Sequence, residues 1–461
     1  MKAGERIVMT IYTYNDLLDC GDSEDRRITF IENVIANHKK SDLYRWAVDA
    51  ENYIRQENTT IMEYVKFLYT IKGNAVPDNY SANHKTASNF YKRFVTQEVE
   101  YLLANGVQFA DDSVKETLGG SKFDRLIKKM VKSAINGGVC FGFWNLDHID
   151  MFKITEFAPL YDEEDGAMKA GVRFWKLASN KPLRATLYEL DGYTEYKEDN
   201  DKGLIVWKEK RPYKLKISES LFDGMQIYDG ENYPTFPIVP LWGNDEHQSK
   251  LVGLKTEIDC YDLIKSGFAN DLDDVSQIYW VLRGAGGMGE QDIAKFLDQL
   301  KRLKATVLDD DDVQADAHTL EVPYQAREVY LTRLEQDMYY DAMAMNPKDL
   351  TGGNVTATAI KASYDNLDHE ANELKGCVED FIADIIALAG ITAEDTEPIF
   401  KVNRISNDTE LTTAVLQAGQ YLDTQTILEK LPFIDTEEVE VILGRIQGEE
   451  MERFVNVDEQ A

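Results

Sequence analysis

The chain has 461 residues, enough for about three domains, and 43% of them are hydrophobic, so a sizeable core can form. It carries 82 acidic residues against 50 basic ones, a formal net charge of −32. Proteins that bind nucleic acid through its phosphates need clustered Lys and Arg, and this chain is strongly acidic instead. It therefore either has no contact with nucleic acid or stays near it without binding. Acidity that serves only solubility is also consistent with the composition.

The cysteines and the hydrophobic runs exclude further classes of protein. The four cysteines, Cys20, Cys140, Cys260 and Cys377, are far apart and form no CxxC motif, so neither a zinc site nor a disulfide framework is predicted. No run approaches the ~20 apolar residues of a membrane span, and the N-terminus lacks the core of a signal peptide. We expect a soluble chain with reduced thiols and no membrane segment.

Helices dominate the first third of the chain. Amphipathic patterns predict helices over residues 24–40, 42–58, 90–105 and 121–136. The turn-rich stretch 73–89 is expected to be a long surface loop.

The period of the pattern changes to two from Val139 to about Trp242. Short runs rich in Val, Tyr, Phe and Trp, separated by Asp, Gly and Asn, predict a β-rich region. It ends in "YPTFPIVPLWGN", where three prolines in seven residues remove donors for strand pairing, so we expect an extended linker there.

Two long helices follow, and each has a narrow apolar seam. The first begins at Leu251, and the last runs from about Val355 to Gly390. At about 1.5 Å per residue they span roughly 35–50 Å, a length that needs neighbours along its course. The first seam comprises Leu251, Leu254, Ile258, Tyr261, Phe268, Leu272 and Val275, with Lys265 as its polar member. The last comprises Ile360, Tyr364, Leu367, Ala371, Leu374, Val378, Phe381, Ile385 and Leu388.

Between these helices the pattern predicts a small α/β insert over residues 278–322. It comprises a strand at 278–282, a helix at 290–304 and a second strand at 305–308. A further helix is expected at 323–343, and a loop in which Pro347 and Gly352-Gly353 forbid helix precedes the last long helix. After Gly390 we expect a strand at 398–404 and two or three short helices.

The insert contains the sharpest enzymatic signal. Gly284, Gly286 and Gly289 match G-x-G-x-x-G after a strand, and Asp309 follows 20 residues later, as in a dinucleotide-binding unit. However, acidic residues stand at the start of the following helix, where a pyrophosphate would bind, and no further βα units follow. A cytoplasmic nucleotide-dependent enzyme that uses this βαβ unit is therefore an alternative, and a turn in a small α/β module is the simpler interpretation.

No other motif predicts catalysis, a cofactor or a metal site. The four aspartates Asp309, Asp310, Asp311 and Asp312 could hold Ca²⁺ or Mg²⁺, but they lack the spacing of a calcium loop and fit an acidic solvated turn. The six histidines are scattered, and neither a P-loop nor a GxSxG motif occurs. We therefore expect a protein that is not an enzyme and has no cofactor.

The order of these elements resembles the portal proteins of tailed bacteriophages, especially long-tailed phages of Gram-positive hosts. The stretches that carry the resemblance are residues 89–109, 236–275 and 354–374. The resemblance implies an α+β, mostly helical fold: a wing (1–250, β-rich over 139–245), a first stem helix (251–277), a clip (278–322), a second stem helix (323–344), a tunnel loop (345–354), a long wing helix (355–390) and a crown (391–461).

The resemblance also implies a function. Copies of the chain, usually about twelve, would form a ring at one capsid vertex, through which double-stranded DNA is packaged and later ejected. The implied partners are the terminase large subunit, the head–tail adaptor, the scaffold and the major capsid protein, in the host cytoplasm during assembly and then in the virion. A helical scaffold without a DNA role remains an alternative from another class.

Candidate site residues follow from this architecture. An acidic lining of the stem would repel DNA phosphates within about 10 Å at ~0.1 M salt, so DNA could slide without binding. The sequence does not decide which helix faces meet the channel, how many subunits form the ring, or whether a metal binds the acidic turn. The tunnel-loop candidates are Asn346, Lys348, Asp349, Thr351, Asn354 and Lys361; the stem-lining candidates are Glu257, Asp259, Asp262, Lys265, Asp271, Asp273 and Asp274; and the clip candidates are Asp309, Asp310, Asp311 and Asp312.

Overall fold

The chain forms two compact units, each built from separate stretches of sequence. The first comprises Met1–Val48, Arg93–Lys250 and Tyr339–Ala461, and the second comprises Asp49–Lys92 and Leu251–Met338. Helices and strands are mixed, as the predicted α+β class requires. The computed structural model describes residues 11–69, 73–79, 81–219, 226–275, 279–283, 314–318, 324–350, 357–392, 396–404, 408–431, 434, 439 and 441–446.

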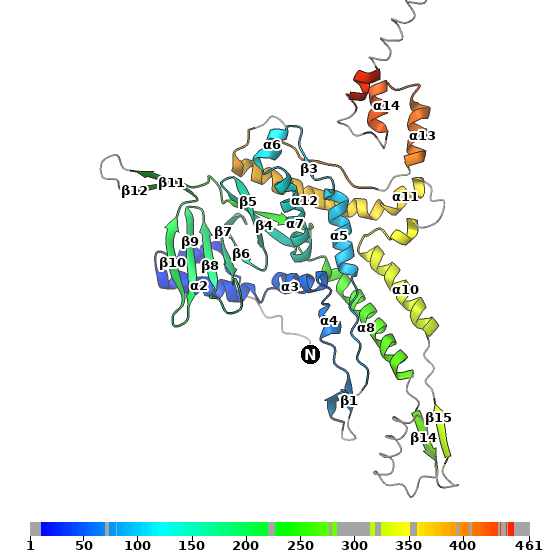
Figure 1. Ribbon diagram of the computed structural model, residues 1–461. Helices are drawn as coiled ribbons and strands as arrows, with labels where there is room; N and C mark the ends of the chain where they lie inside the picture. Colours follow the sequence, from blue (N-terminus) through cyan, green and yellow to red (C-terminus); the bar gives the residue numbers. More distant parts are fainter. Residues whose placement is uncertain are drawn as a thin grey trace, which may run out of the picture. The chain divides into compact units, whose positions relative to one another are not determined.

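A five-stranded antiparallel sheet in the order β10-β9-β8-β7-β6 forms one half of the first unit. Helix α2 (Glu24–His38) lies across one face of this sheet (Figure 1), where its Ile31 and Val34 are buried with Val172 and Phe174. Because successive strand residues point to opposite faces, the intervening residues, which include Trp175 and Tyr188, lie on the other face. The strands are β6 (Phe157–Tyr161), β7 (Met168–Trp175), β8 (Arg184–Glu189), β9 (Gly192–Asp199) and β10 (Gly203–Arg211), and α1 (Tyr14–Asp19) adds Leu17 to the core.

A three-stranded sheet in the order β13-β4-β5 packs beside it through aromatic side chains. Phe141 of β4 (Val139–Asn145) lies 4.6 Å from Phe157, and Phe152 of β5 (His148–Lys153) contacts Tyr188. Helix α7 (Ser121–Gly137) buries one face against this sheet. The β-rich region that the sequence predicted is therefore confirmed.

Strand β13 (Ile238–Trp242) corrects the expectation of an extended linker. It pairs with β4 in spite of Pro240, which lies opposite Phe141. The strand is at the edge of its sheet, where a proline that cannot donate a hydrogen bond is tolerated.

Helix α12 (Asp365–Ala389) confirms its predicted apolar seam from Leu367 to Leu388, and it ends at Gly390 in the left-handed region. Its Phe381 fills the space beside Gly142 of β4, where an added Cβ would lie 2.6 Å from the ring. The predicted single helix from residue 355 is interrupted, however. Helix α11 (Ala357–Ser363) ends at Tyr364, whose N–H bonds to Lys361 in a tighter turn and whose ring is buried against Tyr101.

The segment after α12 returns to α5 (Phe90–Leu103). Strand β16 (Ile399–Phe400) pairs with β3 (Val107–Gln108), so only part of the predicted strand 398–404 forms. Beyond it, Arg404 bonds to both Tyr101 and Asp368, and Tyr101 also donates to Asp368. Burial and the bond to Asp368 raise the pKa of Tyr101 to about 12.

Shorter elements complete the first unit. They are α6 (Asp112–Thr117), the hairpin of β11 (Lys214–Glu219) and β12 (Gln226–Glu231), the 3-10 helix η1 (Pro347–Leu350), and α13 (Asp408–Ala418) and α14 (Thr424–Lys430) near the C-terminus.

The second unit is organised on α8 (Leu251–Val275), close to the predicted 251–277. Helix α10 (Tyr324–Asp341) matches the helix predicted at 323–343. The hairpin of β1 (Phe67–Tyr69) and β2 (Ala75–Pro77) was not predicted, because three-residue strands give too short a pattern. Other elements are α3 (Asp42–Ile54, shared by both units), α4 (Thr59–Met62), β14 (Tyr279–Arg283) and β15 (Gln314–His318). Among the helices of the described ranges, none is long and apolar enough to cross a membrane.

Lys250, the last residue of the first unit, is held by a buried ion cluster. Its Nζ lies 2.5 Å from Glu98 of α5 and 2.7 Å from Glu370 of α12, and its backbone N–H donates to the carbonyl of Ile135 in α7. Burial raises the pKa of Glu98, whereas the two carboxylates raise the pKa of Lys250 against the effect of its own burial. The residue that leads into α8 is thus fixed to three helices.

We predict that Lys250→Met lowers the free energy of unfolding by about 3–5 kcal/mol, because it leaves two carboxylates without their buried cation. Urea unfolding followed by tryptophan fluorescence measures this change. The control is Lys375→Met, which removes an exposed pair with Glu379 on α12 and should cost about 0.5 kcal/mol or less. Equal effects of the two substitutions would contradict the role assigned to Lys250.

Candidate functional site

The buried face of α8 differs from the predicted seam. Leu251, Leu254 and Ile258 are buried as expected, but the next buried residues are Asp262, Ser266 and Asn270, at intervals of four. The predicted Leu272 is 56% exposed. The seam predicted through Tyr261, Lys265 and Phe268 is therefore corrected: the second half of the buried face is polar.

An extended segment of the same unit explains this polar row. The N–H of His84 donates to Asn270 (2.6 Å), that of Thr86 to Ser266 (3.0 Å) and that of Ser88 to Asp262 (2.8 Å). Two residues of extended chain advance about 6.6 Å and four helical residues about 6.0 Å, so alternate amides stay in step with every fourth side chain.

This arrangement corrects the expectation for residues 73–89. The sequence predicted a surface loop throughout, but residues 84–88 have their alternate amides bound by α8. The imidazole of His84 also contacts Asp273, and this contact holds the start of the segment 84–88 against α8. Buried backbone donors need partners, and here helix side chains supply them in place of a neighbouring strand.

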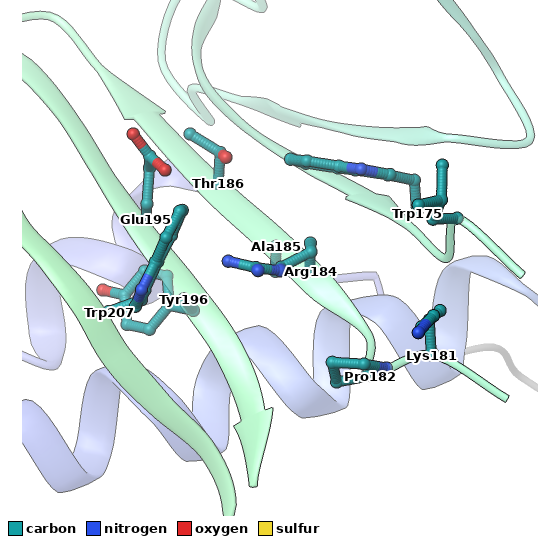
Figure 2. Close-up of a pocket in the computed structure, with 10 residues that line it drawn as sticks. Trp175, Lys181, Pro182, Arg184, Ala185, Thr186, Glu195, Tyr196 and Trp207 are labelled. Carbon is teal, nitrogen blue, oxygen red and sulfur yellow. The ribbon is translucent and has the colours of Figure 1, made fainter.

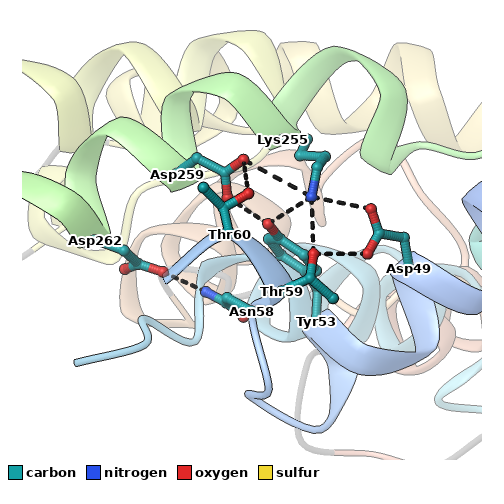
Figure 3. A network of polar contacts seen from close by, with 8 residues as sticks. All are labelled: Asp49, Tyr53, Asn58, Thr59, Thr60, Lys255, Asp259 and Asp262. Carbon is teal, nitrogen blue, oxygen red and sulfur yellow. Dashed lines mark hydrogen bonds and ion pairs between the residues drawn. The ribbon is translucent and has the colours of Figure 1, made fainter. Parts of the chain in front are cut away.

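The first half of α8 carries a polar network around Lys255 (Figure 3). The Nζ of Lys255 lies 2.9 Å from Asp49, 2.8 Å from the hydroxyl of Tyr53 and 3.1 Å from that of Thr59. Asp259 accepts hydrogen bonds from Tyr53 and from Thr60 (2.7 Å). Burial, followed by the contact with Asp259, raises the pKa of Tyr53, while Tyr53 and Asp49 raise that of Lys255 against its desolvation.

Asp262 completes the network from one turn further along. Asn58 donates to its second oxygen (Figure 3). Because Ser88 donates to the first, both oxygens of this fully buried carboxyl are bound by the chain itself. Desolvation raises the pKa of Asp262, and the bonds from Asn58 and Ser88 oppose that rise.

These contacts revise the set of expected stem-lining residues. Asp259 and Asp262 face residues 53–60 and 88 of their own chain, so the expectation that they border a channel is corrected. Of the others, Asp271 pairs with Arg327 of α10, and Lys265 lies 5.8 Å from the ring of Tyr261. Glu257 and Asp273 are at least partly exposed, and Asp274 is the residue before the helix ends at Val275.

The expected tunnel loop is only partly described. Pro347 begins the 3-10 helix η1, which corrects the expectation that no helix forms there; proline is tolerated in a first helical turn, where its missing donor is not needed. Asn346 accepts the N–H of Lys348 (3.1 Å), and the Lys348 and Lys361 side chains are exposed. Asp349 is in η1, and Thr351 and Asn354 lie outside the described residues.

The expected clip is described only at β14 and β15. These strands pair antiparallel, with Tyr279 opposite His318. A βαβ unit requires a parallel neighbour, and β14 has none in the ranges that the structure covers. The glycines at 284–289, the predicted helix 290–304, the predicted strand 305–308 and all four aspartates at 309–312 lie outside those ranges.

No metal-binding arrangement emerges from the described residues, where no three His, Cys, Asp or Glu side chains are grouped to hold an ion. The residues that sequence reasoning missed are the partners of α8: Asp49, Tyr53, Asn58 and Thr60. A signal was present, because Asp262, Ser266 and Asn270 share one helix face. A row of polar residues on one helix face can be predicted to be buried and hydrogen-bonded only when the segment that covers it is known.

Comparison with known proteins identifies the family. Residues 44–453 match the family described as "Phage portal protein, SPP1 Gp6-like". The chain belongs to this family of phage portal proteins. It is 26% identical over 390 residues to the portal protein of Clostridium phage phiCD119, covering 77% of this chain and 83% of that protein. It is 25% identical to the portal protein of Bacillus phage SPP1, covering 93% of this chain and 87% of that protein.

Comparison with solved structures finds weak similarity to neck components of a gene transfer agent. One is the "Neck of native GTA particle computed with C12 symmetry", with a TM-score of 0.43, 12% identity, and coverage of 74% of this chain and 89% of that chain. The neck of the empty particle gives a TM-score of 0.42, also at 12% identity, covering 74% of this chain and 88% of that chain. At these values the similarity carries no functional argument; the portal family rests on the sequence match, and its members are structural proteins.

We predict that the stability of the wild-type chain relative to Asp262→Asn falls as the pH rises. Burial raises the pKa of Asp262 above 3.8, so the folded chain holds this proton more tightly than the unfolded chain does. The raised pKa of Asp262 contributes to the free energy of unfolding. This contribution is fully present below about pH 3.8 and is lost as the pH rises through the raised pKa. The measurement is urea unfolding of both chains between about pH 3 and pH 7, with the exposed-turn variant Asp201→Asn as control. A pH-independent difference would contradict the prediction.

Proposed function

We propose that the chain forms a ring at one vertex of a phage capsid and that double-stranded DNA passes through its central channel during packaging and ejection. The observation that carries this proposal is the family match over residues 44–453 of 461. In this proposal the terminase large subunit drives DNA through the ring, and head–tail adaptor proteins dock on it afterwards. The scaffold and the major capsid protein surround it, first in the host cytoplasm and then in the virion.

The parts of the chain take the roles that the portal resemblance implies. Residues 1–250 and 355–390 form the wing, α8 and α10 the stem, residues 278–322 the clip, 345–354 the tunnel loop and 391–461 the crown. The strand pair β14–β15 would then be the base of the clip, because it follows α8 and precedes α10 in the chain.

Exposed apolar side chains on the stem helices support assembly. Helix α10 buries few of its residues, and Tyr340 is 71% exposed. When a neighbouring copy covers such side chains, the buried apolar surface stabilises the assembly by roughly 25 cal/mol per Å². The other exposed apolar residues of the two helices are Leu272, Tyr324, Val329 and Tyr330.

The proposed set of channel-lining residues is smaller than the full set of acidic residues on α8. Asp259 and Asp262 are bound within the chain and largely covered, whereas Asp271 and Asp273 keep exposed surface beside their partners. The candidates that remain are Glu257, Lys265, Asp271, Asp273 and Asp274. Repeated around a ring, an acidic surface of this kind repels phosphates at short range and lets DNA slide. In the tunnel loop, Lys348 and Lys361 are the basic groups proposed to touch the DNA backbone.

We expect the purified chain to form rings with a central hole under negative-stain electron microscopy. The mass of the same fraction, by light scattering, should correspond to about a dozen subunits of 52.6 kDa. Isothermal titration with NAD and ATP is the companion measurement. A compact monomer or dimer that binds either nucleotide would contradict the proposal and favour an enzyme, whereas a closed oligomer without a hole would favour a scaffold.

We predict that Lys348→Glu in an infectious phage reduces packaged DNA and its retention several-fold while rings still form. The added carboxylate would repel the phosphates that Lys348 is proposed to contact. Quantitative PCR of nuclease-protected DNA measures the effect. The matched control is Lys375→Glu on α12, an exposed lysine outside the tunnel loop. Unchanged packaging and retention in Lys348→Glu would show that Lys348 makes no such contact.

A further inference from the structure

The five-stranded sheet carries a cleft on the part of its outer face that the smaller sheet leaves open. The cleft has a volume of about 340 Å³ (Figure 2). Trp175 at the end of β7 and Trp207 of β10 flank Arg184 of β8, and the β7–β8 connection adds Leu177 and Lys181. None of the residues that line the cleft belongs to the proposed stem helices or to the tunnel loop, and the proposed function uses none of them.

Apolar surface is concentrated at this cleft. Trp207 is 47% exposed and Leu177 is 85% exposed, although most large apolar side chains of the same sheet are buried. Tryptophan and arginine in a concave site are typical of the residues that dominate protein–protein binding energies. A single exposed leucine needs no explanation, but a leucine beside two indole rings and a cavity indicates a docking site.

The charge of the cleft is opposite to that of the chain. The guanidinium carbon of Arg184 lies 4.0 Å from the centre of the Trp207 ring, and its Nη1 is buried without an acceptor among the described residues. The one acidic residue that lines the cleft, Glu195, is already bound by Lys208 (3.0 Å) and Arg211. Arg184 and Lys181 therefore leave local positive charge in a protein of net charge −32.

We propose that this cleft binds an acidic peptide segment of a partner protein. A leucine or phenylalanine of the segment occupies the space beside Trp175 and Trp207, and a neighbouring carboxylate accepts hydrogen bonds from Arg184. Such a bond would give the Arg184 cation an anionic partner, and charge-assisted bonds to arginine are among the strongest that a carboxylate makes. The apolar anchor fixes the position of the peptide, and the carboxylate gives selectivity for acidic sequences.

A peptide explains the cleft better than nucleic acid does. Stacking of a base on an indole ring is possible, but binding of a strand also requires a run of cations along the phosphates. The other basic residues next to the cleft are already paired with carboxylates: Lys176 with Glu198, and Lys208 and Arg211 with Glu195. One small cleft with one available guanidinium suits a single side chain and its neighbouring carboxylate.

The test uses the assembled full-length chain and the probe peptide acetyl-SDLFDE-amide, followed by tryptophan fluorescence and isothermal titration at low salt. Saturable binding is expected, and the basic peptide acetyl-SKLFKK-amide should not bind. Arg184→Gln and Trp207→Ala should each weaken binding at least about tenfold, the scale of losing one charge-assisted bond or one anchor. Lys181→Gln should weaken it less, because its amine is a flexible point charge at the rim.

The matched control is Lys202→Gln, in the exposed turn between β9 and β10 and outside the cleft, which should bind the probe as the wild type does. Circular dichroism and the ring mass establish that each variant is folded and assembled. Absence of saturable binding at about millimolar acidic probe, or equal binding by Arg184→Gln, overturns the proposal. If oligo-dT binds and the peptide does not, the cleft is a nucleic-acid site. If Trp207→Ala lowers the mass of the ring, the cleft is a contact with a second copy of this chain.

Discussion

The buried cluster of Lys250, Glu98 and Glu370 is the interaction on which the arrangement of the first unit depends. One ammonium group joins α5 and α12, and the amide of the same residue joins α7. The chain reaches it through a tight corner, where Gly138 has φ +81° and an added Cβ would lie 2.9 Å from the carbonyl of His247. A buried cation between two carboxylates fixes Lys250 within the first unit more strongly than apolar packing alone would, because each charge requires its partners.

Helix α8 uses its acidic residues in two different ways. Asp259 and Asp262 hold the stretch 53–88 of their own unit, whereas Asp271 and Asp273 lie near the other end and contact Arg327 and His84. An acidic helix in a portal protein therefore cannot be treated as uniformly available to the DNA. Every fourth side chain on one face of α8 binds an alternate amide of residues 84–88, so the helix has the role that a neighbouring strand usually has. The opposite side of α8 is left for other contacts.

The distribution of positive charge is as informative as the overall acidity. Many basic side chains of the described residues are paired with acidic ones, as Lys128 is with Glu100. The guanidinium of Arg184 rests on the ring of Trp207, and its Nη1 has no acceptor among the described residues. In the peptide site that we propose, this cation is the group to which a carboxylate of the partner would bind.

The sequence by itself determined the long helices, the β-rich region, the seam of α12 and its end at Gly390, because strong periodicity and a left-handed glycine act locally. It also carried the portal family. Only the tertiary structure decided that β13 is an edge strand, that α11 and α12 separate at Tyr364, and that Asp259 and Asp262 face inward. Each of these depends on a partner far away in the chain, such as Phe141, Tyr101 or Ser88. Periodicity shows which residues share a helix face, but the segment that covers the face decides whether a carboxylate there meets solvent or a backbone amide.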